Sequence, residues 1–132
     1  MSLRNTISKY FNNHSESKEE HWDPSLQTHY YKTTKDKGMQ MLENFFKSSQ
    51  AYDINSISKE HGEISVNVKK GKKAFIVATV IMVRPYQTAI DFSVTTESVL
   101  PFDFGYSFKL IQKLYTQINK ELQLIEKTKT HR

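Results

Sequence analysis

The run of residues from Ala74 to Val83 constrains the fold of this chain more than any other segment. It reads AFIVATVIMV, so both sets of alternating positions are largely apolar, whereas the stretch from Ile90 to Thr96 alternates apolar and polar residues. The run is about half as long as a membrane-spanning helix requires, and its valines and isoleucines favour a β-strand. We therefore expect a strand that is apolar on both faces, beside a strand with one apolar face.

The neighbouring segments predict that these strands belong to an antiparallel sheet. Residues 63–69 alternate strictly between apolar and polar side chains, and residues 28–33 and 51–58 also have the composition of strands. Gly71 can take the positive φ angle of a tight hairpin. Pro85 has no amide hydrogen to donate to a ladder, so the apolar run should end there in a turn or a bulge. Short turns between successive strands imply an antiparallel meander of four to five strands.

Two segments show the apolar spacing of amphipathic helices, and each has a single apolar stripe. The first follows Thr33 or Thr34, either of which can cap a helix, and its stripe is Met39, Leu42, Phe45 and Phe46. The second stripe consists of Phe108, Ile111, Leu114, Tyr115, Ile118, Leu122 and Ile125. Two helices of this kind cover one sheet face, which predicts an α+β fold: a two-layer sandwich with both main helices on one face.

The length of 132 residues indicates a single domain. We expect residues 1–27 to form an N-terminal amphipathic helix and a polar linker, residues 28–126 to form the α+β domain, and residues 127–132 to be a frayed tail. The short helix is suggested by the spacing of Leu3, Ile7, Tyr10 and Phe11. Trp22 is expected to anchor the linker to the domain surface.

The strand at residues 74–83 leaves one set of apolar side chains without cover. Two helices on one face can shield only one of the two sets, and an apolar stripe within a polar sheet face is a contact surface. Three kinds of cover are open: the N-terminal helix through Leu3, Ile7 and Phe11, a second copy of the protein, or a ligand. We expect a homodimer.

Composition and motifs give little support to catalysis. The chain contains no cysteine, which excludes disulfides and thiolate chemistry and suits a reducing cytoplasm. It lacks a Gly-x-Ser-x-Gly motif and clustered glycines, and its start lacks the apolar run of an export signal. The acidic and histidine residues between His14 and Asp23 match no zinc spacing. We expect no metal, no cofactor, no transmembrane segment and no membrane-surface contact.

One group of polar residues could line a pocket at the end of the sheet, near the Pro85 turn and the junction between the sheet and the last helix. In that case Arg84 or Lys109 would bind an anion. Alternatively, Asp103 caps the last helix, Gly105 permits the turn, and Arg84 pairs with a nearby acid. The group consists of Arg84, Tyr86, Asp91, Asp103, Tyr106 and Lys109.

A net charge of +5 and a lysine cluster raise the alternative of weak nucleic-acid binding. The cluster is a basic patch formed by Lys69, Lys70, Lys72 and Lys73. Together with Tyr30 and Tyr31 it would combine phosphate contacts with base stacking. A moderate excess of lysine more often serves solubility, so we rank this function below protein interaction.

The stretch from Thr28 to Leu122 resembles a small bacterial family of uncharacterised cytosolic proteins. The motifs that carry the resemblance are HYYKT, GEISV, KKGKKAF, VRPYQTAIDFSVTTES and LPFDFGYS. A looser similarity extends to bacterial domains of unknown function in which Asp, an apolar residue and Gly precede the last helix, as Asp103 to Gly105 do here. The resemblance implies a bacterial cytosolic protein and brings no reaction, cofactor or catalytic residue. From the residues we predict a non-enzymatic interaction domain that self-associates.

Overall fold

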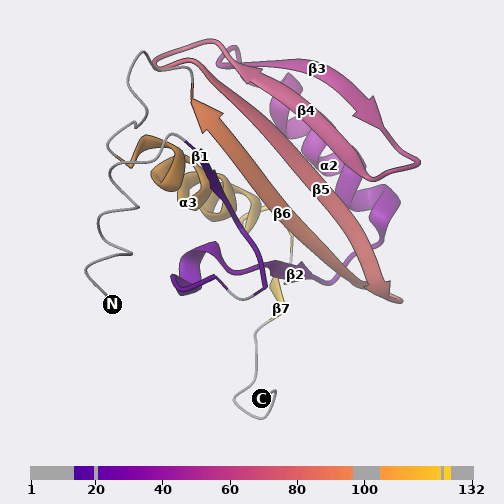
Figure 1. The fold of residues 1–132 in the computed structure, drawn as a ribbon. Coiled ribbons are helices and arrows are strands. Elements are labelled where there is room, and N and C mark those ends of the chain that lie inside the picture. Colours follow the sequence, from indigo (N-terminus) through magenta and orange to yellow (C-terminus); the bar gives the residue numbers. More distant parts are fainter. Residues whose placement is uncertain (1–13, 20, 97–104, 123, 126–132) are drawn as a thin grey trace.

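The computed structural model describes residues 14–19, 21–96, 105–122 and 124–125 (Figure 1). These residues form a sheet of seven strands, two α-helices and one short 3-10 helix. In chain order the elements are β1 (His14–Glu16), η1 (Pro24–Leu26), β2 (His29–Tyr31), α2 (Lys35–Lys47), β3 (Tyr52–Ser58), β4 (Glu63–Val68), β5 (Ala74–Arg84), β6 (Gln87–Thr96), α3 (Tyr106–Ile118) and β7 (Leu124–Ile125).

The sheet is antiparallel throughout, with the strand order β3-β4-β5-β6-β2-β7. Strands β3 to β6 are neighbours in sequence and in space. The second edge of β6 is shared by β1, which pairs with residues 93–95, and β2, which pairs with residues 88–90. The predicted α+β class with an antiparallel sheet is confirmed, and the sheet is wider than the expected four to five strands because short terminal segments join it.

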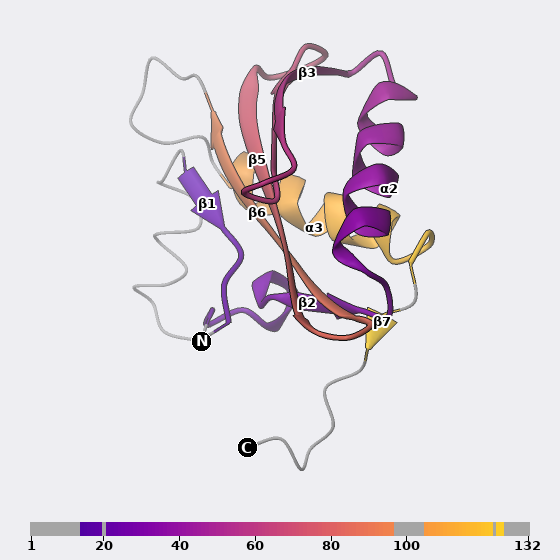
Figure 2. The ribbon, with the colours of Figure 1, turned by 90° about the vertical axis from the view of Figure 1, so that its right-hand side faces the viewer.

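Both helices lie on the same side of the sheet, as the two views show (Figures 1 and 2). The alternate residues of β5 that face the helices are buried, and Ile76 and Ala78 have no exposed surface. They pair in register with Val94 and Phe92 of β6, which are also buried. The core therefore lies between the helices and one face of the sheet, as apolar alternation requires.

The start of α2 agrees with the sequence prediction. The side chain of Thr34 accepts a hydrogen bond from the backbone amide of Lys37 at 3.2 Å, and Asp36 lies in the first turn, where the helix dipole favours a negative charge. Helix α3 begins differently, because its N-cap is Gly105 with a φ of 82° and no side-chain hydrogen bond. Asp103, the predicted cap, lies outside the described residues.

The predicted linker is in part a structural element of the domain. Strand β1 pairs with β6, and Leu26 in η1 is completely buried in the core. Trp22 stacks on Phe108 of α3 with 5.7 Å between ring centroids, which agrees with its expected role as an anchor. The polar composition of this segment concealed two short elements, because a three-residue strand and a single buried leucine produce almost no periodic pattern.

The last helix is shorter than its apolar stripe suggested. Helix α3 ends at Ile118, and Leu124–Ile125 form β7, which pairs with β2. The extension of the predicted helix to Ile125 is therefore wrong. The expected N-terminal helix and the expected frayed tail at residues 127–132 lie outside the described residues.

Strand β3 contains an irregularity that explains its residue pattern. The register with β4 shifts between Ile54 and Ser56, so that Ile54 pairs with Val66 and Ile57 with Ile64. Both partners in β4 are buried. The extra residue lets Ile54 and Ile57, three positions apart, share the face that carries the helices.

Candidate functional site

The polar residues predicted to form one pocket are distributed over the molecule. Arg84 and Tyr86 lie at the turn between β5 and β6. Tyr106 lies at the opposite end of β5, because its hydroxyl donates a hydrogen bond to the carbonyl oxygen of Lys72 at 3.3 Å. An extended strand rises about 3.3 Å per residue, which places the two ends of β5 roughly 33 Å apart. Lys109 lies one turn after Tyr106 on α3 and is exposed, so the length of β5 separates Arg84 from both residues.

The turn between β5 and β6 is exposed. Tyr86 has a φ of 58°, the left-handed conformation that residues other than glycine rarely adopt, and 61% of its surface is exposed. Arg84 pairs with Gln87 across the turn, after a register shift between Met82 and Arg84. The turn predicted at Pro85 is present, and the register of the two strands shifts just before it.

The lysine-rich hairpin between β4 and β5 lies far from Tyr30 and Tyr31. Lys72 Nζ is 5.9 Å from the ring centroid of Tyr106, while Tyr30 and Tyr31 pair with the Thr88–Ala89 end of β6. The other end of β6, at Thr96, is the one that pairs with the start of β5. Tyr31 is completely buried, so the predicted combination of the basic patch with these two tyrosines does not form.

Asp91 is the predicted site residue with the most specific surroundings. Its carboxylate Oδ1 accepts hydrogen bonds from the hydroxyls of Ser17 at 2.7 Å and Thr28 at 2.8 Å. The backbone amide of Phe92 donates to Ser17 Oγ at 2.8 Å, and the Tyr115 hydroxyl lies 2.9 Å from the same oxygen. Asp91 thus holds both ends of the segment from residue 17 to residue 28.

Burial dominates the electrostatics of this network. It raises the pKa of Asp91 above its usual value, although the hydrogen bonds from Ser17 and Thr28 oppose the shift. Burial also raises the pKa of Tyr115, whose ring stacks on His29 with 3.7 Å between centroids. The hydroxyl of Tyr115 is 2.6 Å from the carbonyl oxygen of Ile90, to which it donates. These contacts fix a loop and leave the Ser17 hydroxyl, which is buried, without access to a substrate.

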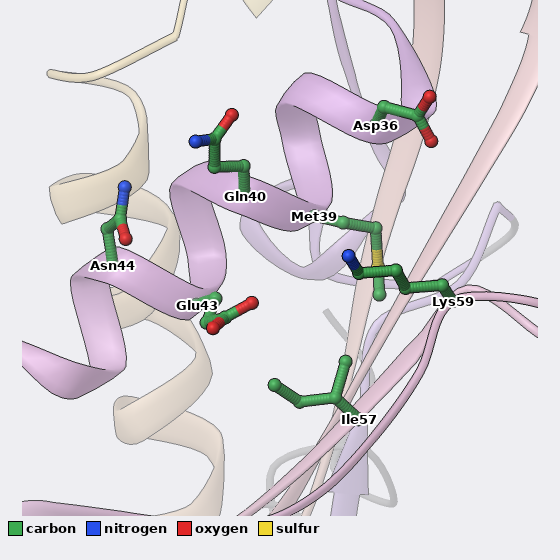
Figure 3. Close-up of a pocket in the computed structure, with 7 residues that line it drawn as sticks. All are labelled: Asp36, Met39, Gln40, Glu43, Asn44, Ile57 and Lys59. Atoms are coloured by element: carbon green, nitrogen blue, oxygen red, sulfur yellow. The ribbon is translucent and has the colours of Figure 1, made fainter.

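A cleft of about 430 Å³ lies between α2 and the end of β3 (Figure 3). It arises because β3 is the edge strand, so that Ile57 faces the helix layer yet remains 36% exposed. Two carboxylates and one lysine share the opening, and the carboxylate of Glu43 is bonded to Lys47 at 2.6 Å. Its lining consists of Asp36, Met39, Gln40, Glu43, Asn44, Ile57 and Lys59. Nothing in this lining forms a catalytic arrangement.

We call the sheet face opposite the helices the outer face. Its β5 positions form the β5 stripe, which consists of Phe75, Val77, Thr79 and Ile81. Phe75 is 38% exposed and Ile81 is 53% exposed, whereas the alternate residues of β5 from Ala74 to Val80 are buried against the helices. The side chains of the β5 stripe are therefore the set that the helices leave uncovered.

The neighbours of the β5 stripe are polar and carry negative rather than positive charge. In register, Phe75 lies between Asn67 and Thr95, Val77 between Ser65 and Ser93, and Thr79 between Glu63 and Asp91. Asp53 of β3 pairs with Asn67 and extends the Phe75 row by one strand. In these three rows of β3 to β6 there is no lysine or arginine, although the whole chain has a net charge of +5. The outer face is an apolar stripe bordered by hydroxyls, amides and carboxylates.

Within the described part of the chain, no three histidine, cysteine, aspartate or glutamate side chains gather closely enough to hold a metal ion. None of the helices described is long and apolar enough to cross a membrane. Comparison with protein-family models, curated proteins and solved structures gave no match. The outer face is the strongest candidate for a functional surface, because large apolar side chains are exposed on it.

Sequence reasoning identified Asp91 but missed its partners. Alternation along β6 predicted that Asp91 faces away from the helices, and nothing in the polar segment around Ser17 indicated that it would return to this carboxylate. Ile57 faces the helix layer, and the exposed cleft beside it depends on β3 being an edge strand. Neither contact has a local sequence signal.

Proposed function

We propose that this chain is a non-enzymatic protein-interaction domain that self-associates through its outer face. The observation that carries the proposal is the exposure of Phe75 and Ile81 on β5, on the face opposite both helices. A layer that covered these side chains would gain about 25 cal/mol for each Å² of apolar surface removed from water. A second copy supplies that layer.

Two outer faces can pack as stacked sheets. Facing sheets lie about 10 Å apart and interdigitate their side chains, and a stripe that extends from Phe75 to Ile81 is about 20 Å long at 3.3 Å per residue. The serine, threonine and asparagine side chains beside the stripe can satisfy hydrogen bonds across such an interface. Glu63 and Asp53 of two copies would repel each other, so association should strengthen with added salt.

The test is the mass of the full-length protein in solution, measured by sedimentation equilibrium over a range of concentrations. We expect a monomer–dimer equilibrium that Ile81→Ser weakens at least tenfold. Met82→Ser is the matched control, because Met82 is an adjacent apolar residue of similar exposure, 45%, whose partner Thr88 lies on the helix-facing side. Equal effects of the two substitutions, or a monomer at every concentration, would overturn the proposal.

Nucleic-acid binding at the lysine-rich hairpin is the second candidate. The observation that favours it is the position of Lys72 over the Tyr106 ring, since basic groups beside an aromatic ring are typical of single-strand binding surfaces. Affinity would then fall steeply with salt as counterions are released. Binding at physiological salt that disappears when Lys70, Lys72 and Lys73 are changed to Glu would reverse the ranking.

The proposed setting is the bacterial cytoplasm. It is supported by the absence of cysteine from the sequence, which suits a reducing compartment, and by the resemblance described from Thr28 to Leu122. An interaction domain of this kind needs no cofactor.

A further inference from the structure

We propose that residues 1–13 of the same chain dock on the outer face as an amphipathic helix and compete there with the second copy. This inference rests on the proposed function, since both occupants use the β5 stripe. Residues 1–13 would cover the outer face of their own molecule, and two copies would associate only after this segment is released.

The point where residues 1–13 join the sheet places them within reach. His14 pairs with Thr95, and Thr95 pairs with Phe75, so the chain enters β1 in the row of the stripe that contains Phe75. Neighbouring strands are about 4.8 Å apart, which puts His14 roughly 10 Å from β5. Thirteen residues extend about 20 Å as a helix and about 43 Å as an extended chain. The extended length is enough to cross to β5 and follow the stripe to Ile81, and a helix set beside Phe75 covers the stripe as far as Thr79.

The chemistry of this segment complements the outer face. Leu3, Ile7, Tyr10 and Phe11 recur at helical spacing and would form one apolar side. Arg4 and Lys9 are the charged residues of the segment, and both are basic. In such a helix Arg4 lies beside the apolar side, where it would face the carboxylates of Asp53 and Glu63 in the Phe75 and Thr79 rows, while Lys9 lies on the side turned to solvent.

A tethered segment competes effectively with a free second copy. A short flexible connection gives an effective concentration on the order of millimolar, well above the concentration at which a cytosolic protein normally meets another copy. Helices of two to three turns are marginal in water on their own, so the segment would become helical as its apolar side is buried. The protein would then be mainly monomeric while the segment is docked and would associate when it is displaced.

The absence of cysteine allows a direct test in the full-length chain. The pair Ile7→Cys and Thr79→Cys places one thiol on the apolar side of the segment and one at the centre of the stripe. Under dilute mild oxidation we expect a disulfide within one chain, formed at least tenfold faster than in the control pair Asn5→Cys and Thr79→Cys. Asn5 lies on the opposite side of the same helix.

The second measurement is self-association of the full-length variant Leu3→Ser/Phe11→Ser, with Asn5→Ser/Asn12→Ser as its control. We expect the dissociation constant of the dimer to fall at least fivefold in the first variant and to stay unchanged in the control. A disulfide between two chains would assign the segment to the neighbouring copy and overturn docking within one chain. Equal oxidation rates with unchanged association would overturn docking altogether.

These outcomes separate the two proposals. If Ile81→Ser weakens the dimer but the cysteine pairs oxidise at equal rates, the interaction domain stands and the docked segment fails. The opposite result is a disulfide that forms preferentially in the Ile7→Cys/Thr79→Cys variant, while the wild type and the Leu3→Ser/Phe11→Ser variant are monomeric at every concentration. In that case the segment covers the face and self-association fails.

Discussion

At the scale of single residues, Asp91 shows how one carboxylate can organise a loop. It accepts hydrogen bonds from Ser17 and Thr28, 74 and 63 positions away in sequence. Between these contacts, the amide of Lys18 donates to Leu26 and the amide of Thr28 donates to Lys18. The loop is therefore closed by two backbone hydrogen bonds and by the carboxylate that both its ends share.

Replacement of Asp91 should reveal the cost of its buried charge. Asp91→Asn keeps an acceptor oxygen for Ser17 and Thr28 but removes the ionisation. Because burial raises the pKa of Asp91 in the folded state, stability is greatest where the group is protonated and declines as the pH rises through the folded-state pKa. Asp91→Asn should therefore gain stability relative to the wild type as the pH rises above the ordinary pKa of an aspartate, measured by urea unfolding over a series of pH values.

The contrasting variant is Asp91→Ala. It leaves two hydroxyls without their acceptor, so it should lower the free energy of unfolding by roughly 1–3 kcal/mol at neutral pH. If Asp91→Asn and the wild type show the same pH dependence, Asp91 does not carry the pH-dependent part of the stability.

At the scale of elements, the two hairpins that flank β4 both depend on glycines with positive φ. Gly62 has a φ of 68° and Gly71 a φ of 79°, but their surroundings differ. A Cβ at Gly62 would lie 2.3 Å from the carbonyl oxygen of Val80, whereas a Cβ at Gly71 would meet nothing within 4 Å. The first hairpin packs against the neighbouring strand, and the second projects into solvent.

Alanine substitutions separate backbone strain from steric overlap. Gly71→Ala should cost about 1–2 kcal/mol, the penalty of a left-handed alanine. Gly62→Ala carries the same penalty and must also displace the backbone at Val80, whose amide donates to the carbonyl of Gly62 at 2.7 Å. We expect the melting temperature of Gly62→Ala to be several degrees below that of Gly71→Ala, measured by circular dichroism. Equal melting temperatures would mean that the backbone at Val80 shifts without cost.

The elements that sequence predicted well are those with a repeated local signal. Strict alternation located β4, double apolar alternation located β5, and the choice of Thr33 or Thr34 as the cap located the start of α2, where Thr34 is the cap. Strands β1 and β7 have three and two residues, and each exists because of a partner that is distant in sequence. The same limit applies to the predicted pocket, since local motifs placed Arg84 and Tyr106 together while the length of β5 separates them.

At the scale of the whole molecule, the domain begins earlier than position 28. Strand β1 and the buried Leu26 belong to the sheet and the core, and Ser17 belongs to the Asp91 network. A truncation that respects the fold therefore removes residues 1–13 and not residues 1–27.

Two truncations should behave differently in thermal unfolding monitored by circular dichroism. Removal of residues 1–13 should retain a cooperative transition, because every described element remains. Removal of residues 1–27 deletes β1, η1 and Leu26, and loss of a buried leucine side chain alone costs about 2–5 kcal/mol. We expect that protein to unfold at a much lower temperature or to lack a transition. A full-length Leu26→Ala variant that is as stable as the wild type would contradict this view of the N-terminal segment.

The position of β1 and β2 on one edge of β6 has a consequence for how the chain folds. His14 pairs with Thr95, 81 positions further along (95 − 14 = 81), and His29 pairs with Ile90. Both N-terminal strands must wait until β6 has been synthesised, while the hairpins from β3 to β6 can form from adjacent segments. Closing such large loops costs entropy before any contact offsets it. The meander should therefore assemble first, and the N-terminal strands should complete the sheet last.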